Sequence, residues 1–336
     1  MKNRLNMPQA LHVVCGMAIG ILTCLVVASC SRDSESNRPH ISIVQYVDHP
    51  ALDACRAGFL EEMAALGHKD GKSIDISYEN ANGDPNLAHA IAEKTAGGKP
   101  SLVFTLATPM SQAMKRATEG KGIPIIFGAI TDPVSAGLVE TMDRPGKNIT
   151  GTSDRWPYFG QLSLLKETLP NVRKVGVVFN PGEDNTRYAM AQTRKAAEEL
   201  GLELVEAPVT SAAEVSEAAL SISARCDAFY VPADNTAMAS AGAIIKVANS
   251  RKIPVVAGDP ETFKQGCIVG LGVSYRDLGV QNARQADKIL KGTPASQIPV
   301  FSSSEGKLMV NLAVAKVLGI VIPPSVVERA DETVSK

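Results

Sequence analysis

Polar residues that could bind a small ligand follow the apolar segments of this 336-residue chain at repeated positions. The stretches are Asp48-His49-Pro50, Ala107-Thr108-Pro109, Thr131-Asp132-Pro133, Asn180 to Asn185, Asp234-Asn235-Thr236 and Gly258-Asp259-Pro260. Most fit a helix N-cap followed by a proline, a pattern that needs no ligand. Several helix N-termini at one cleft, however, would also suit an anionic group, because their backbone N–H groups and dipoles point there.

The segments that position these residues alternate between short β-branched runs and amphipathic helical stretches. The expected strands are 41–47, 74–78, 102–106 and 123–127, then 175–179, 203–207, 228–231 and 253–257. The expected helices between them are 51–66, 86–96, 109–119, 186–200, 212–224 and 236–250. This alternation predicts parallel sheets covered on both faces. The fold class is therefore α/β, with two doubly wound parallel-sheet lobes joined by a multi-strand hinge.

Three polar or glycine-containing connections, near 148–157, 270–275 and 293–304, are interpreted as crossovers between the lobes. A helix at 277–291 would return to the first lobe, and residues 306–322 to the second. The predicted N-terminal lobe is 41–152 plus 276–300, and the predicted C-terminal lobe is 153–275 plus 301–336. Several crossings form a hinge, which lets two lobes close over a ligand.

The N-terminus indicates export. Lys2 and Arg4 precede an uncharged run, 11–29, that ends in Val27-Ala28-Ser29 before Cys30. The ending resembles a bacterial lipobox, which implies a lipoprotein signal peptide at 1–29 and a lipidated Cys30 on a flexible tether, 30–40. Two or more acyl chains, palmitate among them, anchor a protein stably to a membrane. The alternative is an uncleaved signal anchor.

Composition and motifs argue against several classes of protein. Lys and Arg number 34 against 35 Asp and Glu, so the charge gives no reason to expect a nucleic-acid partner. Cys55, Cys226 and Cys267 lack the spacing of metal ligands and are expected to be buried thiols, with a Cys226–Cys267 disulfide as the alternative. Gly67–Ser73 only partly matches a phosphate-binding loop and runs from helix to strand. We therefore expect no catalysis, no metal and no cofactor.

The chain resembles one family in a series of stretches that follow one another in order. They are VDHPALDACRAGF, ENANGD, TLATPMSQA, ITDPVSAGLV, NITGTSDRWP, FNPGEDNT, VPADNTAM and IPVVAGD. These resemble the substrate-binding lipoproteins of ABC importers with the type I periplasmic-binding-protein fold, in the group with tryptophan- and tyrosine-binding members. Many members carry Ser where this chain has Thr186, which keeps the hydroxyl.

The resemblance implies an exported, membrane-anchored monomer that binds an aromatic amino acid between its lobes. The closed form would deliver the ligand to a membrane permease powered by a cytoplasmic ATPase. A nucleoside-binding importer subunit and the ligand-binding subunit of a sensor are the alternatives. The sequence leaves open which membrane holds the anchor.

The same resemblance, checked against the chemistry of a zwitterion, suggests a role for each polar candidate. Thr108, Asn185 and Thr186 would hold the carboxylate, because hydrogen bonds to charged groups are strong. Asp154 and Asp234 would hold the ammonium, with help from Asn235.

The remaining candidates concern the ligand's side chain and the helix caps. Trp156 and Tyr46 would pack against an aromatic ring, and Gln45 would hydrogen-bond a polar atom on it. Trp156 could instead only separate the lobes at the hinge, and Tyr46 could be core. Asp132 and Asp259 belong to the candidate set but are best explained as caps. His49 is expected to be structural, at a helix start.

Overall fold

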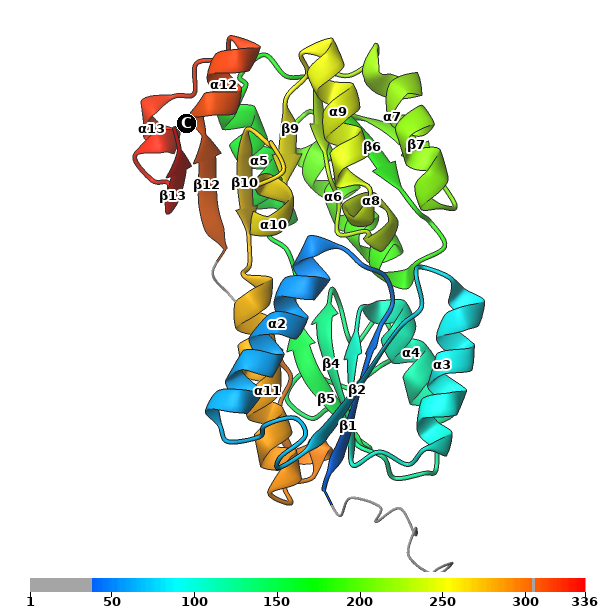
Figure 1. The fold of residues 1–336 in the computed structure, drawn as a ribbon. Helices are drawn as coiled ribbons and strands as arrows, with labels where there is room; N and C mark the ends of the chain where they lie inside the picture. The colour runs from blue at the N-terminus through cyan, green and yellow to red at the C-terminus, as the bar shows by residue number, and fades with distance from the viewer. Residues whose placement is uncertain (1–37, 304–305, 336) are drawn as a thin grey trace, which may run out of the picture. The chain divides into compact units, whose positions relative to one another are not determined.

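A parallel sheet forms the centre of the first lobe in this computed structural model, which describes residues 38–303 and 306–335 (Figure 1). The strand order is β11-β5-β4-β3-β1-β2. The strands are β1 (His40–Gln45), β2 (Asp75–Asn80), β3 (Leu102–Leu106), β4 (Ile125–Ile130), β5 (Ile149–Ser153) and β11 (Phe301–Ser302). Helices α2 (Pro50–Ala65) and α11 (Tyr275–Leu290) cover one face, while α3 (Pro85–Gly97) and α4 (Thr108–Ala117) cover the other. All residues of the inner strands β3, β4 and β5 are buried, as expected when helices cover both faces.

The second lobe is built around a sheet of order β13-β12-β10-β9-β8-β6-β7. Its strands are β6 (Lys174–Phe179), β7 (Glu203–Pro208), β8 (Ala228–Tyr230), β9 (Val255–Ala257), β10 (Val269–Gly272), β12 (Lys307–Asn311) and β13 (Glu332–Val334). The accompanying helices are α5 (Tyr158–Thr168), α6 (Asp184–Glu199), α7 (Val215–Ser223), α8 (Asn235–Ala239), α9 (Ala241–Arg251), α10 (Pro260–Phe263), α12 (Leu312–Leu318) and α13 (Pro324–Val327). A 3₁₀ turn, η1 (Ala212–Glu214), precedes α7. A second 3₁₀ turn, η2 (Ala295–Gln297), lies against β5 of the first lobe. The sheet is mostly parallel, but β10 and β12 pair antiparallel.

Two connections that the sequence suggested to be crossovers contain strands of the sheets. β5 follows β4 in the first sheet, and β10 pairs with β9 in the second. The chain does cross between the lobes after β5 and after β10, so only the strands themselves were not predicted. A Cβ on Gly151 would lie 2.0 Å from the carbonyl oxygen of Phe127, so β5 needs glycine to approach β4. A glycine that signals a loop in the sequence is here a requirement of close strand packing.

The third crossover ends in the first lobe. Phe301 and Ser302 form β11, which pairs in parallel with β5. The boundary that the sequence placed after residue 300 therefore assigns these two residues to the wrong sheet. The helix expected at 277–291 does return to the first lobe, as α11, where it packs against α2.

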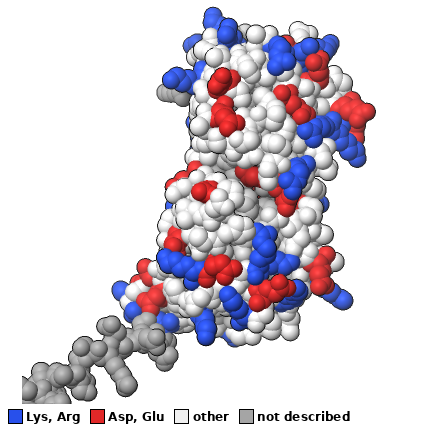
Figure 2. Space-filling view, turned by 90° about the vertical axis from the view of Figure 1, so that its right-hand side faces the viewer, with Lys and Arg blue, Asp and Glu red and all other residues white. Residues whose placement is uncertain are grey.

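Residues 39–336 form one compact unit. The predicted signal peptide, the lipidated Cys30 and most of the tether lie outside the described residues. In the part of the chain described, no helix is both long and apolar enough to cross a membrane. Cys226 and Cys267 are free thiols, so the alternative of a disulfide between them is wrong in this structure. On the face drawn in Figure 2, Lys and Arg lie among Asp and Glu over both lobes.

Candidate ligand-binding site

A small cavity lies where the two lobes meet, at the carboxyl ends of the parallel strands. Its free volume is only about 10 Å³. Its lining comes from both lobes: His49, Leu52, Thr108, Ala129, Thr131, Asp154, Asn185, Ala233, Asp234, Asn235, Met238 and Tyr275. This is the position at which open α/β sheets bind ligands.

The cavity brings together part of the predicted site. Thr108, Asp154, Asn185, Asp234 and Asn235 line it. Thr186 lies directly behind, fully buried, and its hydroxyl donates a 2.7 Å hydrogen bond to Asp234. The other predicted residues do not line this cavity: Gln45, Tyr46, Asp132, Trp156 and Asp259.

The first lobe contributes the N-terminus of α4. Ala107, the residue before this helix, has a φ of 76° and makes no capping hydrogen bond with its side chain. Ala129, which lines the cavity at the end of β4, has a φ of 60°. Left-handed backbone at a non-glycine residue is costly and is found often at ligand sites. The first turn of α4 thus offers N–H groups and the Thr108 hydroxyl to an anionic group.

Asp234 is used within the second lobe. Its Oδ1 accepts a 2.6 Å bond from the Ala237 N–H, and so caps α8. Its Oδ2 accepts from the Asn180 N–H and from the Thr186 hydroxyl, each at 2.7 Å. Three protein donors therefore bind this carboxylate and hold the rim, while its contact with an ammonium stays a prediction.

Two acceptors of the cavity have no protein partner. Asp154 and Asn185 are 3% and 7% exposed. Within the described residues, neither Asp154 Oδ1 nor Asn185 Oδ1 finds a hydrogen-bond donor. Tyr275 donates to the other oxygen of Asp154, and burial raises the Asp154 pKa to about 6. Buried acceptors are normally paired, so these two call for a donor-rich group between the lobes.

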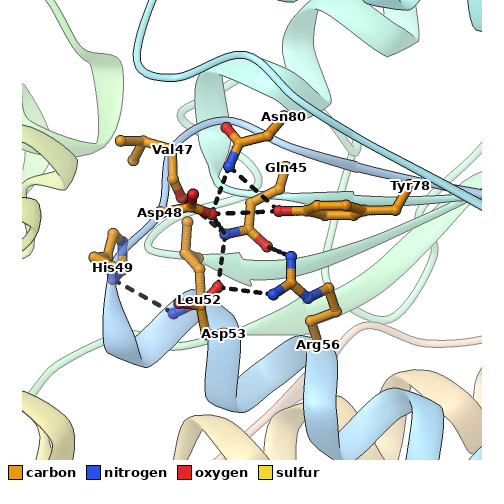
Figure 3. A network of polar contacts seen from close by, with 9 residues as sticks. All are labelled: Gln45, Val47, Asp48, His49, Leu52, Asp53, Arg56, Tyr78 and Asn80. Atoms are coloured by element: carbon orange, nitrogen blue, oxygen red, sulfur yellow. Dashed lines mark hydrogen bonds and ion pairs between the residues drawn. The ribbon is translucent and has the colours of Figure 1, made fainter.

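Gln45 does not line the cavity and belongs to a network of polar contacts at the end of β1 (Figure 3). Its amide nitrogen donates to the Val47 carbonyl, to Asp48 and to Asp53, and its oxygen accepts from Arg56. The three acceptors around its nitrogen use both N–H groups, so the amide has no donor left for a ligand ring. The network fixes the loop between β1 and α2, and this loop carries His49.

The predicted aromatic residues also lie elsewhere. Tyr46 is 4% exposed and donates to the Gly83 carbonyl at 3.0 Å. Trp156 is 3% exposed and packs over Gly258, where a Cβ would lie 2.0 Å from its ring. Its ring also neighbours Tyr158, at a centroid distance of 6.4 Å. Trp156 thus packs within the second lobe and does not line the cavity.

Asp132 and Asp259 bind backbone N–H groups, in keeping with the cap pattern. Asp132 accepts from the Ser135 N–H at 2.7 Å and pairs with Arg155. Asp259 caps α10 by accepting from the Thr262 N–H at 2.8 Å.

Seven residues that line the cavity are not among the predicted ligand-binding residues, and three of them have side chains that bear on the site. His49 is the N-cap of α2, as expected, but it also lines the cavity. Tyr275 could have been found from its place after the second connection, while Met238 carries no signal beyond its apolar side chain. These side chains supply the donor to Asp154 and part of the apolar surface.

A family model described as ABC transporter substrate binding protein matches residues 40–334. The chain belongs to this family. A curated relative, the tyrosine-binding protein of Clostridioides difficile, is 34% identical over 311 residues, which cover 89% of this chain and 90% of the relative.

Two solved structures show how this substrate-binding protein compares in conformation. A Streptococcus pneumoniae domain in complex with L-Trp is 31% identical with a TM-score of 0.84, and the match covers 88% of this chain and 100% of that one. The ligand-free, open structure of a substrate-binding protein from Clostridium difficile is 36% identical, with a TM-score of 0.65 and coverage of 89% and 100%. The higher score goes with the lower identity. The lobes of this substrate-binding protein are therefore arranged more like those of the ligand complex.

Polar contacts between the lobes accompany this closed arrangement. The Gln112 amide of α4 donates to Asp184 of α6 at 2.5 Å. His49 Nε2 lies 3.4 Å from Asn235 Oδ1. Both contacts join the first lobe to the second, so opening must break them.

Replacing Gln112 should shorten the time for which the substrate-binding protein stays closed on its ligand. A hydrogen bond to a charged group contributes about 1.5–3 kcal/mol, so we expect Gln112→Ala to raise the ligand dissociation rate about tenfold. Gln112→Glu should raise it further, because it places a second carboxylate against Asp184. Stopped-flow fluorescence measures both rates. Unchanged rates in both variants would show that this contact does not hold the lobes together.

Proposed function

We propose that this substrate-binding protein binds a free aromatic α-amino acid between its lobes and delivers it to an ABC importer. The observation that carries the proposal is the pair of unpartnered acceptors, Asp154 Oδ1 and Asn185 Oδ1. An ammonium group supplies the donors that both lack. The ligand carboxylate would bind at the uncapped N-terminus of α4, beside Thr108.

The relatives support the ligand class. One is named for tyrosine and another was solved with L-Trp, and each covers most of this chain. Leu52, Met238 and Tyr275 would contact the side chain of the ligand. The present cavity lies below the range of about 300–1,000 Å³ that is usual for ligand sites. The lobes must therefore separate to admit an aromatic ring.

The transport role extends from the family to the parts of the system around it. We propose that Cys30 is lipidated and holds the protein on the extracytoplasmic side of a membrane. The closed form would then present its ligand to a permease, which a cytoplasmic ATPase powers. A ligand changes the balance between open and closed forms only through contacts that are better in the closed form, so both lobes must contribute to the site.

The test is a thermal-shift panel on residues 31–336, unfolded and refolded to remove any bound ligand. At a concentration of one hundred times its Kd, a ligand should add about 2.7 kcal/mol to the free energy of unfolding. We expect tryptophan, tyrosine or phenylalanine to raise the melting temperature and sugars to leave it unchanged. Stabilisation by nucleosides alone would overturn the assignment of Asp154 and Asn185 to an ammonium.

A further inference from the structure

A chain of buried hydrogen bonds runs from the first lobe into the second beside the cavity. His49 Nδ1 accepts the Leu52 N–H, and therefore Nε2 carries the proton of the neutral ring and donates to Asn235 Oδ1 at 3.4 Å. The Asn235 amide in turn donates to Glu183 Oε2. The Thr236 hydroxyl lies 3.2 Å from Glu183 Oε1. His49 and Glu183 are each 4% exposed, so closing removes both ends of the chain from water.

No cation pairs with Glu183 within the described residues, although Arg116 of α4 and Arg187 of α6 line the same pocket. Asp234 lies beside it on the loop before α8, and Tyr46 faces it from the end of β1. On α6 itself, Arg187 pairs with Asp184. Among residues 38–303 and 306–335, no Lys or Arg forms an ion pair with Glu183. A buried carboxylate without a cation is expensive to keep ionised.

The neighbours of His49 give the ring no firm partner for a positive charge. Asp48, next to it in the chain, is exposed, and its carboxylate bonds Gln45, Tyr78 and Asn80. Protonating Nδ1 would also remove the acceptor that caps α2. Burial lowers the pKa of His49 to about 4, while burial and then the charge of Asp234 raise the pKa of Glu183.

We propose that His49 and Glu183 both enter the closed cleft as uncharged groups, so that closing over a ligand releases a proton from His49 and adds one to Glu183. The His49 proton leaves Nδ1 for water, and the Glu183 proton comes from water to Oε1, where it faces the Thr236 hydroxyl. No net proton is gained or lost. This inference rests on the proposed function, since it concerns closing over the amino acid.

The two linkages have opposite signs over the same range of pH. In the open form we expect His49 and Glu183 to face water and to have their ordinary pKa values of 6.5 and 4.5. The lowered pKa of His49 then makes closing more favourable as the pH rises from about 4 to 6.5. The raised pKa of Glu183 makes closing less favourable as the pH rises above 4.5. Between 4.5 and 6.5 the two effects cancel, which would give a binding protein outside the cytoplasm an affinity that resists changes in external pH.

Replacing either His49 or Glu183 should make the proton exchange of the other residue measurable. The experiment compares the heat of L-Trp binding at pH 5.5 in two buffers that differ in ionisation enthalpy, because the difference in heat gives the number of protons exchanged. Apart from the contribution of Asp154, the wild type should exchange close to none. Glu183→Gln should release about one proton, with an affinity that rises up to tenfold per pH unit. His49→Asn, which keeps a capping side chain, should take up about one, with an affinity that falls by the same factor.

The controls separate this effect from other titrations in the cavity. Asp154 also titrates near this range but contributes equally to all three proteins, so the differences from the wild type remove it. Asp184→Asn changes the neighbouring carboxylate, which is half-exposed. It should weaken binding through its contact with Gln112 but exchange the same number of protons as the wild type. Variants that bind L-Trp without any change in proton exchange would overturn the proposal.

A second measurement works without any ligand. Gln112→Cys and Asp184→Cys, joined by a short bis-maleimide in a Cys226→Ser background, would hold the lobes closed; Cys55 and Cys267 are buried. NMR of the His49 ring should then show it neutral at pH 5.5, and charged before cross-linking. If L-Trp does not bind, the proposed function fails, but this titration still decides: a cross-linked His49 that titrates near 6.5 overturns the inference.

Discussion

Asp154→Ala should nearly abolish binding of the amino acid, with a rise in Kd of about 100- to 4,000-fold. Asp154 is buried at the cavity, and its Oδ1 has no other partner within the described residues. Removing one member of a buried charge pair costs about 3–5 kcal/mol, because the other charge stays without compensation. Each 1.4 kcal/mol corresponds to a factor of ten in Kd. Isothermal titration calorimetry with L-Trp measures the change.

Asp132→Asn is the matched control for this prediction. Asp132 is also a buried aspartate at the end of a first-lobe strand, but it binds the Ser135 N–H and Arg155 outside the cavity. We expect its Kd to stay within a few-fold of the wild type. Equal losses in the two variants would mean that Asp154 acts through the fold, and an unchanged Kd in Asp154→Ala would remove it from the site.

Much of the fold could be predicted, because buried parallel strands have a strong signal. The strand expected at 102–106 begins and ends at the same residues as β3, because every side chain in Leu102–Leu106 is buried and only Thr105 is polar. β5 was missed because Thr150, Gly151 and Thr152 read as a polar connection. Their hydroxyls bond inside the first lobe, Thr150 to the Ile298 carbonyl and Thr152 to Asn282. Such long-range partners leave no mark in the local sequence.

The site could be predicted to the edge of the sheet but not to each side chain. Thr108, Asp154 and Asn185 follow from the rule that ligands bind beyond the carboxyl ends of strands. Gln45 lies at such an end too, but Arg56 and Asp53, on the following helix, hold its amide. Trp156 turns toward Gly258, a residue one hundred positions away. Which polar group is free and which is occupied depends on contacts that only the folded chain creates.

The contact between α2 and α11 depends on two glycines, Gly58 and Gly279. A Cβ on Gly279 would lie 1.9 Å from the carbonyl oxygen of Cys55, and one on Gly58 would lie 2.1 Å from that of Arg276. Backbone stands on both sides of each contact, so no side chain can move aside. This crossing fixes α11, whose first residue, Tyr275, donates to Asp154.

Gly279→Ala should lower the free energy of unfolding by about 1–3 kcal/mol, the usual cost of overpacking a core. The loss should occur although alanine favours a helix over glycine by about 1 kcal/mol. Urea unfolding of the ligand-free protein measures it. Gly97→Ala is the matched control: Gly97 ends α3 with no atom within 4 Å of an added Cβ, so the same exchange should leave stability unchanged or slightly raised. The Gly279 variant should also bind the amino acid more weakly, because a displaced α11 carries Tyr275 away from Asp154. Wild-type stability in Gly279→Ala would mean that α2 and α11 do not cross at this distance. The crossing would then not be what holds Tyr275 against Asp154.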